Sequence, residues 1–78
     1  MSLFPKIQET IAATLNVSAA EIVETTVSED LEAWDSLGQV NLIMALEQAF
    51  GIYIEVEEFE KLNSVPAITA FLTKQGIA

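Results

Sequence analysis

The 78-residue chain contains neither cysteine nor histidine, and its only basic side chains are three lysines. Without cysteine there is no disulfide, no thiolate metal site and no cysteine nucleophile. Without histidine the chain lacks the side chain best suited to move protons at neutral pH, so serine–histidine and cysteine–histidine catalysis are excluded. An enzyme using paired carboxylates is the remaining catalytic alternative, and it is disfavoured because so short a chain has little volume for a substrate cleft.

The balance of charge is strongly acidic. Twelve acidic residues give a net charge of -9, which should repel nucleic acids and anionic membranes and favour basic partner surfaces. The content of 51% hydrophobic and 19% charged residues favours a folded protein.

The length suits one domain, residues 1–78, and no stable oligomer is indicated, so we expect a monomer. The longest apolar run, Leu42–Leu46, cannot span a bilayer, and we expect a cytoplasmic protein without membrane insertion.

Helical spacing of apolar residues predicts the first helix from Ser2 to Leu15, with Ser2 as candidate N-cap. It should bury one stripe, Leu3, Phe4, Ile7, Ile11 and Leu15, and expose Gln8, Glu9 and Thr14. A long connection follows over residues 17–35, where Ser18 and Glu21 have capping-box spacing. We expect an ordered loop pinned to the core by its apolar residues, Ile22, Val23, Val27, Leu31 and Trp34.

The second helix is predicted over Leu37–Phe50, with capping side chains at Asp35 and Ser36 and with Gly51 at its end. Residues 52–54 should be an extended loop, and Val56–Leu62 a short helix. The last helix should begin after the N-cap Ser64 and run to about Gln75. The expected fold is all-α: a small four-helix bundle of three main helices and one short helix, with a long ordered loop between the first two.

The second helix has apolar residues on two faces. Leu42, Ile43, Leu46 and Phe50 share one face, and Leu37, Val40 and Met44 lie nearly opposite. A bundle this small cannot easily cover both, so the second set should form a partly exposed patch of the kind that marks a binding surface. The alternative is that the short helix or the long loop covers it.

Ser36 stands at the start of this helix. Its simplest role is an N-cap. A phosphate ester on its hydroxyl would instead lie where free backbone N–H groups and the helix dipole favour an anion. A modifiable serine beside a recognition patch is therefore physically coherent, whatever the modifying group.

The stretch around Ser36 contains Asp35-Ser36-Leu37, followed by Val40, Leu42, Met44-Ala45-Leu46-Glu47 and Phe50-Gly51-Ile52. This stretch resembles the prosthetic-group segment of the acyl carrier protein family. The resemblance extends over nearly the whole chain through Leu15-Asn16-Val17, Glu21-Ile22, Glu29-Asp30-Leu31, Glu57-Glu58-Phe59, Lys61-Leu62 and Ser64-Val65. In register with one another these segments are specific, although Asp-Ser-Leu alone is not.

The resemblance implies a carrier, not an enzyme, in which a phosphodiester links Ser36 Oγ to 4′-phosphopantetheine, donated by coenzyme A through a separate Mg²⁺-dependent phosphopantetheinyl transferase. The thiol of that arm would hold an acyl group as a thioester for acyl-loading and acyl-processing enzymes. Catalytic groups then belong to the partners, which explains how a chain without cysteine or histidine takes part in acyl chemistry.

Site roles also follow from the resemblance. Asp35 is implied in transferase recognition. The partner-binding residues would be Leu37, Val40, Met44 and Glu47, and the acyl pocket Leu46, Ile54, Phe59 and Leu62.

The second helix departs from fatty-acid carriers, which usually display a dense acidic face there. Here only Glu47 is charged, and the residues without charge are Gly38, Gln39, Asn41, Gln48 and Ala49. Together with Trp34 directly before Asp35, this favours a specialised carrier with a dedicated set of partners. The alternative is a carrier-like module that is never modified and binds partners non-covalently through Leu37, Val40 and Met44.

The remaining acids fall into two clusters, Glu29, Asp30, Glu32 and Asp35, and Glu55, Glu57, Glu58 and Glu60. Crowded carboxylates repel one another, so salt or a divalent cation should raise the melting temperature. We expect no structural metal, because Trp34 stands where a calcium loop would need a third ligand after Asp30 and Glu32.

Overall fold

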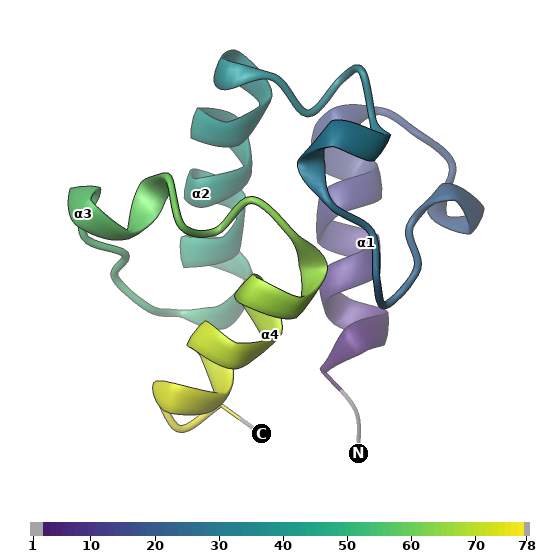
Figure 1. The fold of residues 1–78 in the computed structure, drawn as a ribbon. Coiled ribbons are helices and arrows are strands. Elements are labelled where there is room, and N and C mark those ends of the chain that lie inside the picture. Colours follow the sequence, from purple (N-terminus) through teal and green to yellow (C-terminus); the bar gives the residue numbers. More distant parts are fainter. Residues whose placement is uncertain (1–2, 78) are drawn as a thin grey trace.

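The computed structural model describes residues 3–77, in which the α-helices are α1 (Phe4–Leu15), α2 (Ser36–Phe50), α3 (Val56–Phe59) and α4 (Val65–Lys74) (Figure 1). α1 and α2 lie side by side and run in opposite directions; α3 lies against α2 and α4 against α1. Within residues 3–77 the only β pairing is an isolated bridge. The predicted all-α fold of three main helices and one short helix is confirmed.

α1 buries the predicted stripe through Ile7, Ile11 and Leu15, with Leu3 and Phe4 partly buried against the same core. The helix begins at Phe4, and Leu3 occupies the N-cap position without a side-chain hydrogen bond. Ser2, the expected cap, lies outside the described residues. The helix ends where Asn16 takes the left-handed conformation at φ 56°, which asparagine tolerates better than most residues.

Gln8 differs from the expectation that it faces solvent. Its side chain is half-buried, and Nε2 donates hydrogen bonds to the carbonyl oxygens of Ala19 and Ile22, both at 2.9 Å. The outer face of α1 therefore holds the first part of the long loop.

The loop over residues 17–35 is ordered and contains two 3₁₀ turns, Ala19–Glu21 and Ser28–Asp30. The capping box is confirmed: Ser18 Oγ accepts from the Ala20 N–H at 3.3 Å, and the Ser18 N–H donates to Glu21 Oε2 at 3.2 Å. The Ser28 N–H donates to the Asn63 carbonyl and the Val65 N–H to the Thr26 carbonyl, both at 2.8 Å. These two bonds join the loop to the start of α4.

The apolar loop residues that were expected to pack against the core differ in burial. Ile22 and Trp34 are buried, Val27 and Leu31 are half-buried, and Val23 is exposed. The expectation for Val23 is wrong because Thr26 Oγ1 accepts from the Val23 N–H at 2.8 Å, in a turn that buries Thr26 instead.

α3 is shorter than predicted and ends at Phe59 instead of Leu62. The N–H groups of Lys61 and Leu62 both bond to the Glu58 carbonyl, at 3.0 and 3.2 Å, so the chain tightens and turns. The turn places Leu62 in the core, where it is 2% exposed. Residues 52–54 form a loop that is neither helix nor strand. The N-cap of α4 is confirmed, because Ser64 Oγ accepts from the Ala67 N–H at 3.1 Å.

Candidate functional site

The N-terminus of α2 is capped by Asp35, whose Oδ1 accepts from the Gly38 N–H at 2.8 Å. Ser36 is therefore the first residue of the helix and not its cap, so the simplest role considered for it is wrong. Ser36 is exposed, and within residues 3–77 its hydroxyl makes no hydrogen bond. The geometry leaves a free serine oxygen at the positive end of a helix of 15 residues.

Gly38 allows the first turn of α2 to pack tightly. It is buried, and a Cβ at this position would collide with the Ala33 carbonyl oxygen and come within 3.0 Å of Leu15 Cδ2. The absence of a side chain brings α2 close to both the loop and α1. The sequence pattern did not identify this requirement, because a glycine inside a helix carries no signal of the atoms that approach it.

The two faces of α2 separate as predicted. Leu42, Ile43 and Leu46 are at most 1% exposed, whereas Leu37, Val40 and Met44 are 70%, 45% and 51% exposed. Neither α3 nor the loop covers these three residues, which we call the apolar patch. The alternative that they are covered is wrong for the part of the chain that the structure describes.

Glu47 is set apart from the apolar patch by its own hydrogen bond. Its Oε2 accepts from the Ile54 N–H at 2.9 Å, and the residue is half-buried. One carboxylate oxygen is thus used to hold the connection between α2 and α3.

A pocket of about 530 Å³ lies beside Ser36, between α2 and α3. Its lining comes from both helices and the turn after α3: Ser36, Gln39, Val40, Val56, Glu57, Phe59 and Glu60. Sequence reasoning missed Gln39 and Val56 as neighbours of Ser36. The three-residue spacing from Ser36 to Gln39 carried that signal, but Val56 lies in a four-residue helix, too short for a periodic pattern.

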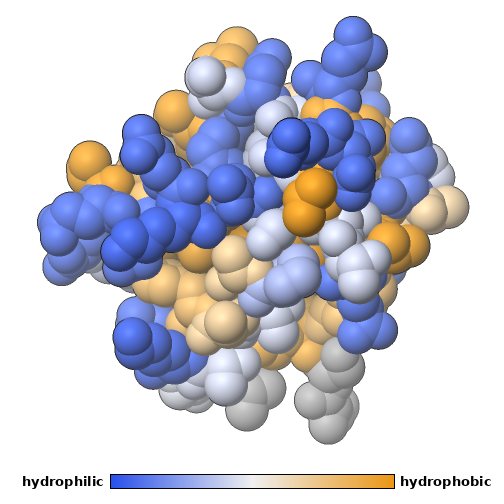
Figure 2. Space-filling view, viewed as in Figure 1, coloured by the Kyte–Doolittle hydropathy of each residue, from blue (hydrophilic) through white to orange (hydrophobic). Residues whose placement is uncertain are grey.

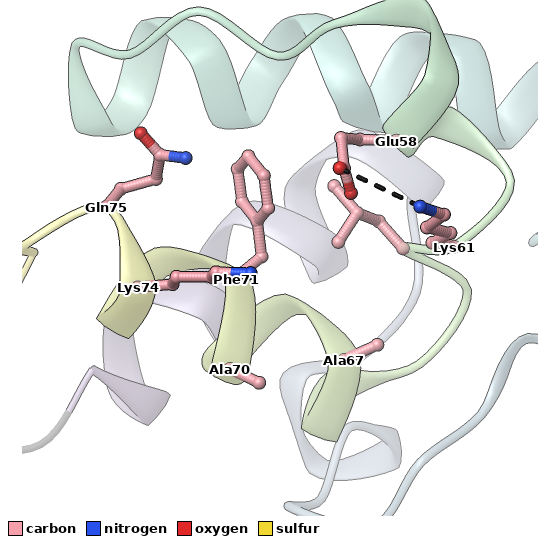
Figure 3. A pocket seen from close by; sticks show the side chains of 8 residues that line it. Glu58, Lys61, Ala67, Ala70, Phe71, Lys74 and Gln75 are labelled. Carbon is pink, nitrogen blue, oxygen red and sulfur yellow. Dashed lines mark ion pairs between the residues drawn. The ribbon is translucent and has the colours of Figure 1, made fainter.

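The four residues expected to form an acyl pocket all belong to the hydrophobic core or its edge. Leu46, Ile54 and Leu62 are buried in one cluster, and half-buried Phe59 packs against that cluster and lines the pocket beside Ser36. Leu62 also lines a different pocket of about 540 Å³ between α3 and α4. In that pocket Phe71 points up from α4 between Gln75 and Glu58, and Lys61 pairs with Glu58 at 4.0 Å (Figure 3).

The surface chemistry follows the acidic composition. Hydrophilic side chains gather over α3 on the face seen in Figure 2, and apolar ones show between α3 and α4. Over residues 3–77 the pair Lys61–Glu58 is the only ion pair, and no group of three or more acidic side chains is placed to hold a metal ion. None of the helices described is long and apolar enough to cross a membrane.

Comparison with known proteins gives consistent matches. The family profile for the phosphopantetheine attachment site matches residues 5–72. The acyl carrier protein of Helicobacter pylori (strain G27) is 43% identical over 79 residues, which cover 100% of both chains. Those of Rubrobacter xylanophilus and Thermosynechococcus vestitus are 43% and 40% identical over 77 residues, covering 97% of this chain and 94% of each relative. The matched range runs from α1 into α4 and includes the free serine of α2.

Proposed function

Since the chain belongs to the acyl carrier protein family, we propose that Ser36 is the residue that bears its 4′-phosphopantetheine arm, and that residues 1–78 act as one domain. The observation that carries the assignment is the free, exposed Ser36 hydroxyl at the N-terminus of α2. Because Asp35 already caps the helix, esterification of Ser36 removes no hydrogen bond from the fold. The helix dipole and the free N–H groups of the first turn favour the negative charge of a phosphodiester there.

The attachment step requires little of this chain beyond an accessible oxygen. Ser36 Oγ forms a bond to the phosphorus that bears the pantetheine half of coenzyme A, and the bond from that phosphorus to the adenosine bisphosphate half breaks. The hydroxyl proton leaves to a base outside this chain, which has no histidine. When bound, the arm supplies the thiol that holds an acyl group as a thioester. The chain is thus a carrier, and catalysis belongs to its partners.

The residues around Ser36 fit such an arm. The adjacent pocket of about 530 Å³ is open beside the Ser36 side chain. Val40, Val56 and Phe59 give it apolar walls, and Glu57 and Glu60 give it carboxylate oxygens that can accept from the N–H groups of the arm. These groups suit an arm that alternates methylene and amide units.

The partners we propose are a phosphopantetheinyl transferase and acyl-loading and acyl-processing enzymes, which dock on the apolar patch. Its three side chains are exposed on the same helix as Ser36, and no element within residues 3–77 covers them, as a docking surface requires. Glu47 contributes at the edge through the carboxylate oxygen that does not bind Ile54. The uncharged neighbours Asn41 and Gln48 favour partners with apolar or polar sockets over strongly basic ones.

We place this carrier in the cytoplasm, because a carrier that works through a free thiol needs a compartment that keeps thiols reduced. An acyl pocket formed by Leu46, Ile54, Phe59 and Leu62 would require α2 and α3 to separate, because three of these residues are buried in the core.

Intact mass spectrometry tests the assignment of Ser36. The purified chain is incubated with coenzyme A, Mg²⁺ and a broad-specificity phosphopantetheinyl transferase, beside Ser36→Ala and Ser28→Ala. Ser28 is a matched control because its hydroxyl makes no hydrogen bond within residues 3–77. Wild type and Ser28→Ala should each gain one phosphopantetheine, and Ser36→Ala none. A gain on Ser36→Ala would place the arm elsewhere, and no gain on folded wild type would favour an unmodified module that binds partners through the apolar patch.

A further inference from the structure

The side-chain amide of Gln39 joins three separate parts of the fold. Its Nε2 donates to the carbonyl oxygens of Phe59 and Leu62, at 2.5 and 3.0 Å. Its Oε1 accepts from the indole N–H of Trp34 at 2.6 Å. One side chain on α2 thus ties the loop that precedes α2 to the turn that ends α3. We call this set of three hydrogen bonds the Gln39 clamp.

The Gln39 clamp stands between Ser36 and the core. Gln39 is one turn after Ser36 on α2 and lines the pocket beside it. The next residues along that side of α2, Ile43 and Leu46, are 0% and 1% exposed. A hydrocarbon chain that starts at Ser36 and enters the core along this side of α2 therefore passes the clamp.

Opening the Gln39 clamp is unfavourable for a hydrocarbon. All its members are half-buried or buried, and Trp34 is only 5% exposed. Separating Gln39 from the end of α3 would leave the carbonyls of Phe59 and Leu62 without their donor. A methylene chain offers neither donor nor acceptor in return, so the unpaired groups would oppose its burial.

We propose that Gln39 is a specificity-determining residue, which holds the end of α3 against α2 and so keeps long hydrocarbon cargo out of the core. This carrier then favours short or polar acyl groups, which remain in the pocket of about 530 Å³ beside Ser36. A polar cargo can also hydrogen-bond to the groups that line the pocket. The inference rests on the proposed function in one respect, the attachment of cargo at Ser36.

The test measures how the melting temperature depends on the length of the acyl chain. Wild type, Gln39→Met and Gln48→Met are loaded from acetyl-, butyryl-, octanoyl- and dodecanoyl-coenzyme A by the transferase, and intact mass confirms each product. Methionine matches glutamine in length but makes none of the clamp bonds. Gln48 is the matched control, since it is exposed on the same helix and makes no side-chain hydrogen bond within residues 3–77. The melting temperature of every product is measured, with the emission of Trp34, the only tryptophan.

The wild type and Gln48→Met should show the same melting temperature and the same Trp34 emission for all four acyl groups. Gln39→Met should be stabilised by about 4 °C or more between acetyl and dodecanoyl, because the longer chain now enters the core. A purely structural Gln39 would lower the melting temperature equally for every cargo.

Two results would overturn this inference and leave the proposed function intact. One is a melting temperature that rises with acyl chain length in the wild type, and the other is the same dependence on chain length in wild type and Gln39→Met. If Gln39→Met does not fold, the wild-type measurements alone test the inference. A higher melting temperature or a shift in Trp34 emission on dodecanoyl loading would show that the clamp admits the chain. A wild type that accepts no acyl arm at all removes the proposed function, and this inference with it.

Discussion

Asp35 caps α2, and substitutions can separate this role from the recognition by a transferase that the resemblance implies. Its carboxylate caps α2 through Gly38, and it precedes the proposed attachment serine. Asp35→Ala should lower the free energy of unfolding by about 0.5–2 kcal/mol, whereas Asp35→Asn should change it by only a few tenths, because asparagine caps helices as well as aspartate does. Urea unfolding measures both.

The same two variants test whether a transferase recognises the carboxylate. If it does, Asp35→Asn loads phosphopantetheine as slowly as Asp35→Ala, although its helix is intact. Loading at the wild-type rate by Asp35→Asn would limit Asp35 to capping. The rate is followed by intact mass over time.

Gly38 should be intolerant of even one added methyl group. Gly38→Ala places a Cβ against the Ala33 carbonyl, which is backbone and cannot rotate away. We expect a loss of about 1–3 kcal/mol in the free energy of unfolding, typical of overpacking. The control Asn41→Ala lies exposed on the same helix and should stay within about 0.5 kcal/mol of wild type. Equal stability of Gly38→Ala would mean that the loop at Ala33 moves aside without cost.

Among the elements, α2 has one buried face and one exposed face, so the docking proposed for the exposed face can be tested apart from stability. Met44→Gln changes an exposed side chain of the apolar patch, so the free energy of unfolding should stay within about 0.5 kcal/mol of wild type. The kcat/KM of a partner enzyme that docks there should fall about fivefold or more, the effect of losing roughly 1 kcal/mol at an interface. Val23→Gln is the matched control, an exposed apolar residue away from the patch. Equal losses in both variants would remove the patch as the docking surface.

An element could be predicted from the sequence where the residues that determine its ends lie close together in the chain. The sequence predicted α1, α2 and α4 because their caps and apolar periods lie within a few residues of one another, as with Ser64 and Ala67. It did not predict the end of α3 at Phe59, since the turn that follows carries a bond from Gln39, 20 residues away. The partial burial of Gln8 was not predicted for the same reason, because its side chain bonds to loop carbonyls that lie 11 and 14 residues further along the chain.

The candidate site shows the same division. The exposed face of α2 follows from helical geometry, so Leu37, Val40 and Met44 were predictable. The choice of Asp35 over Ser36 as the cap was not, since both residue types cap helices well and the register of the first turn depends on the close approach of Gly38 to the loop. How Leu46, Ile54, Phe59 and Leu62 lie relative to the pocket beside Ser36 depends on tertiary packing, which no periodicity encodes.

At the scale of the whole molecule, the net charge of -9 is spread over a body of 29 × 28 × 19 Å. Attraction between opposite charges offsets little of the repulsion among these negative charges. Within residues 3–77 the only ion pair, Lys61–Glu58, has a separation of 4.0 Å and an exposed lysine, and such surface pairs contribute about 0–1 kcal/mol. Repulsion among the carboxylates is therefore an uncompensated term that opposes the compact state.

Added salt should accordingly raise the melting temperature. The Debye length is about 30 Å at 0.01 M ionic strength, close to the longest dimension of the molecule, and about 3 Å at 1 M. At low salt every carboxylate thus repels all the others, and at high salt only its nearest neighbours. Circular dichroism melts across this range should show a steady rise, with millimolar Mg²⁺ adding to it. The double variant Glu29→Gln/Glu57→Gln, which neutralises one exposed acid in each cluster, should melt higher at low salt and respond less to added salt. A melting temperature unchanged by NaCl and Mg²⁺ would show that the carboxylates are too well solvated for their repulsion to affect folding.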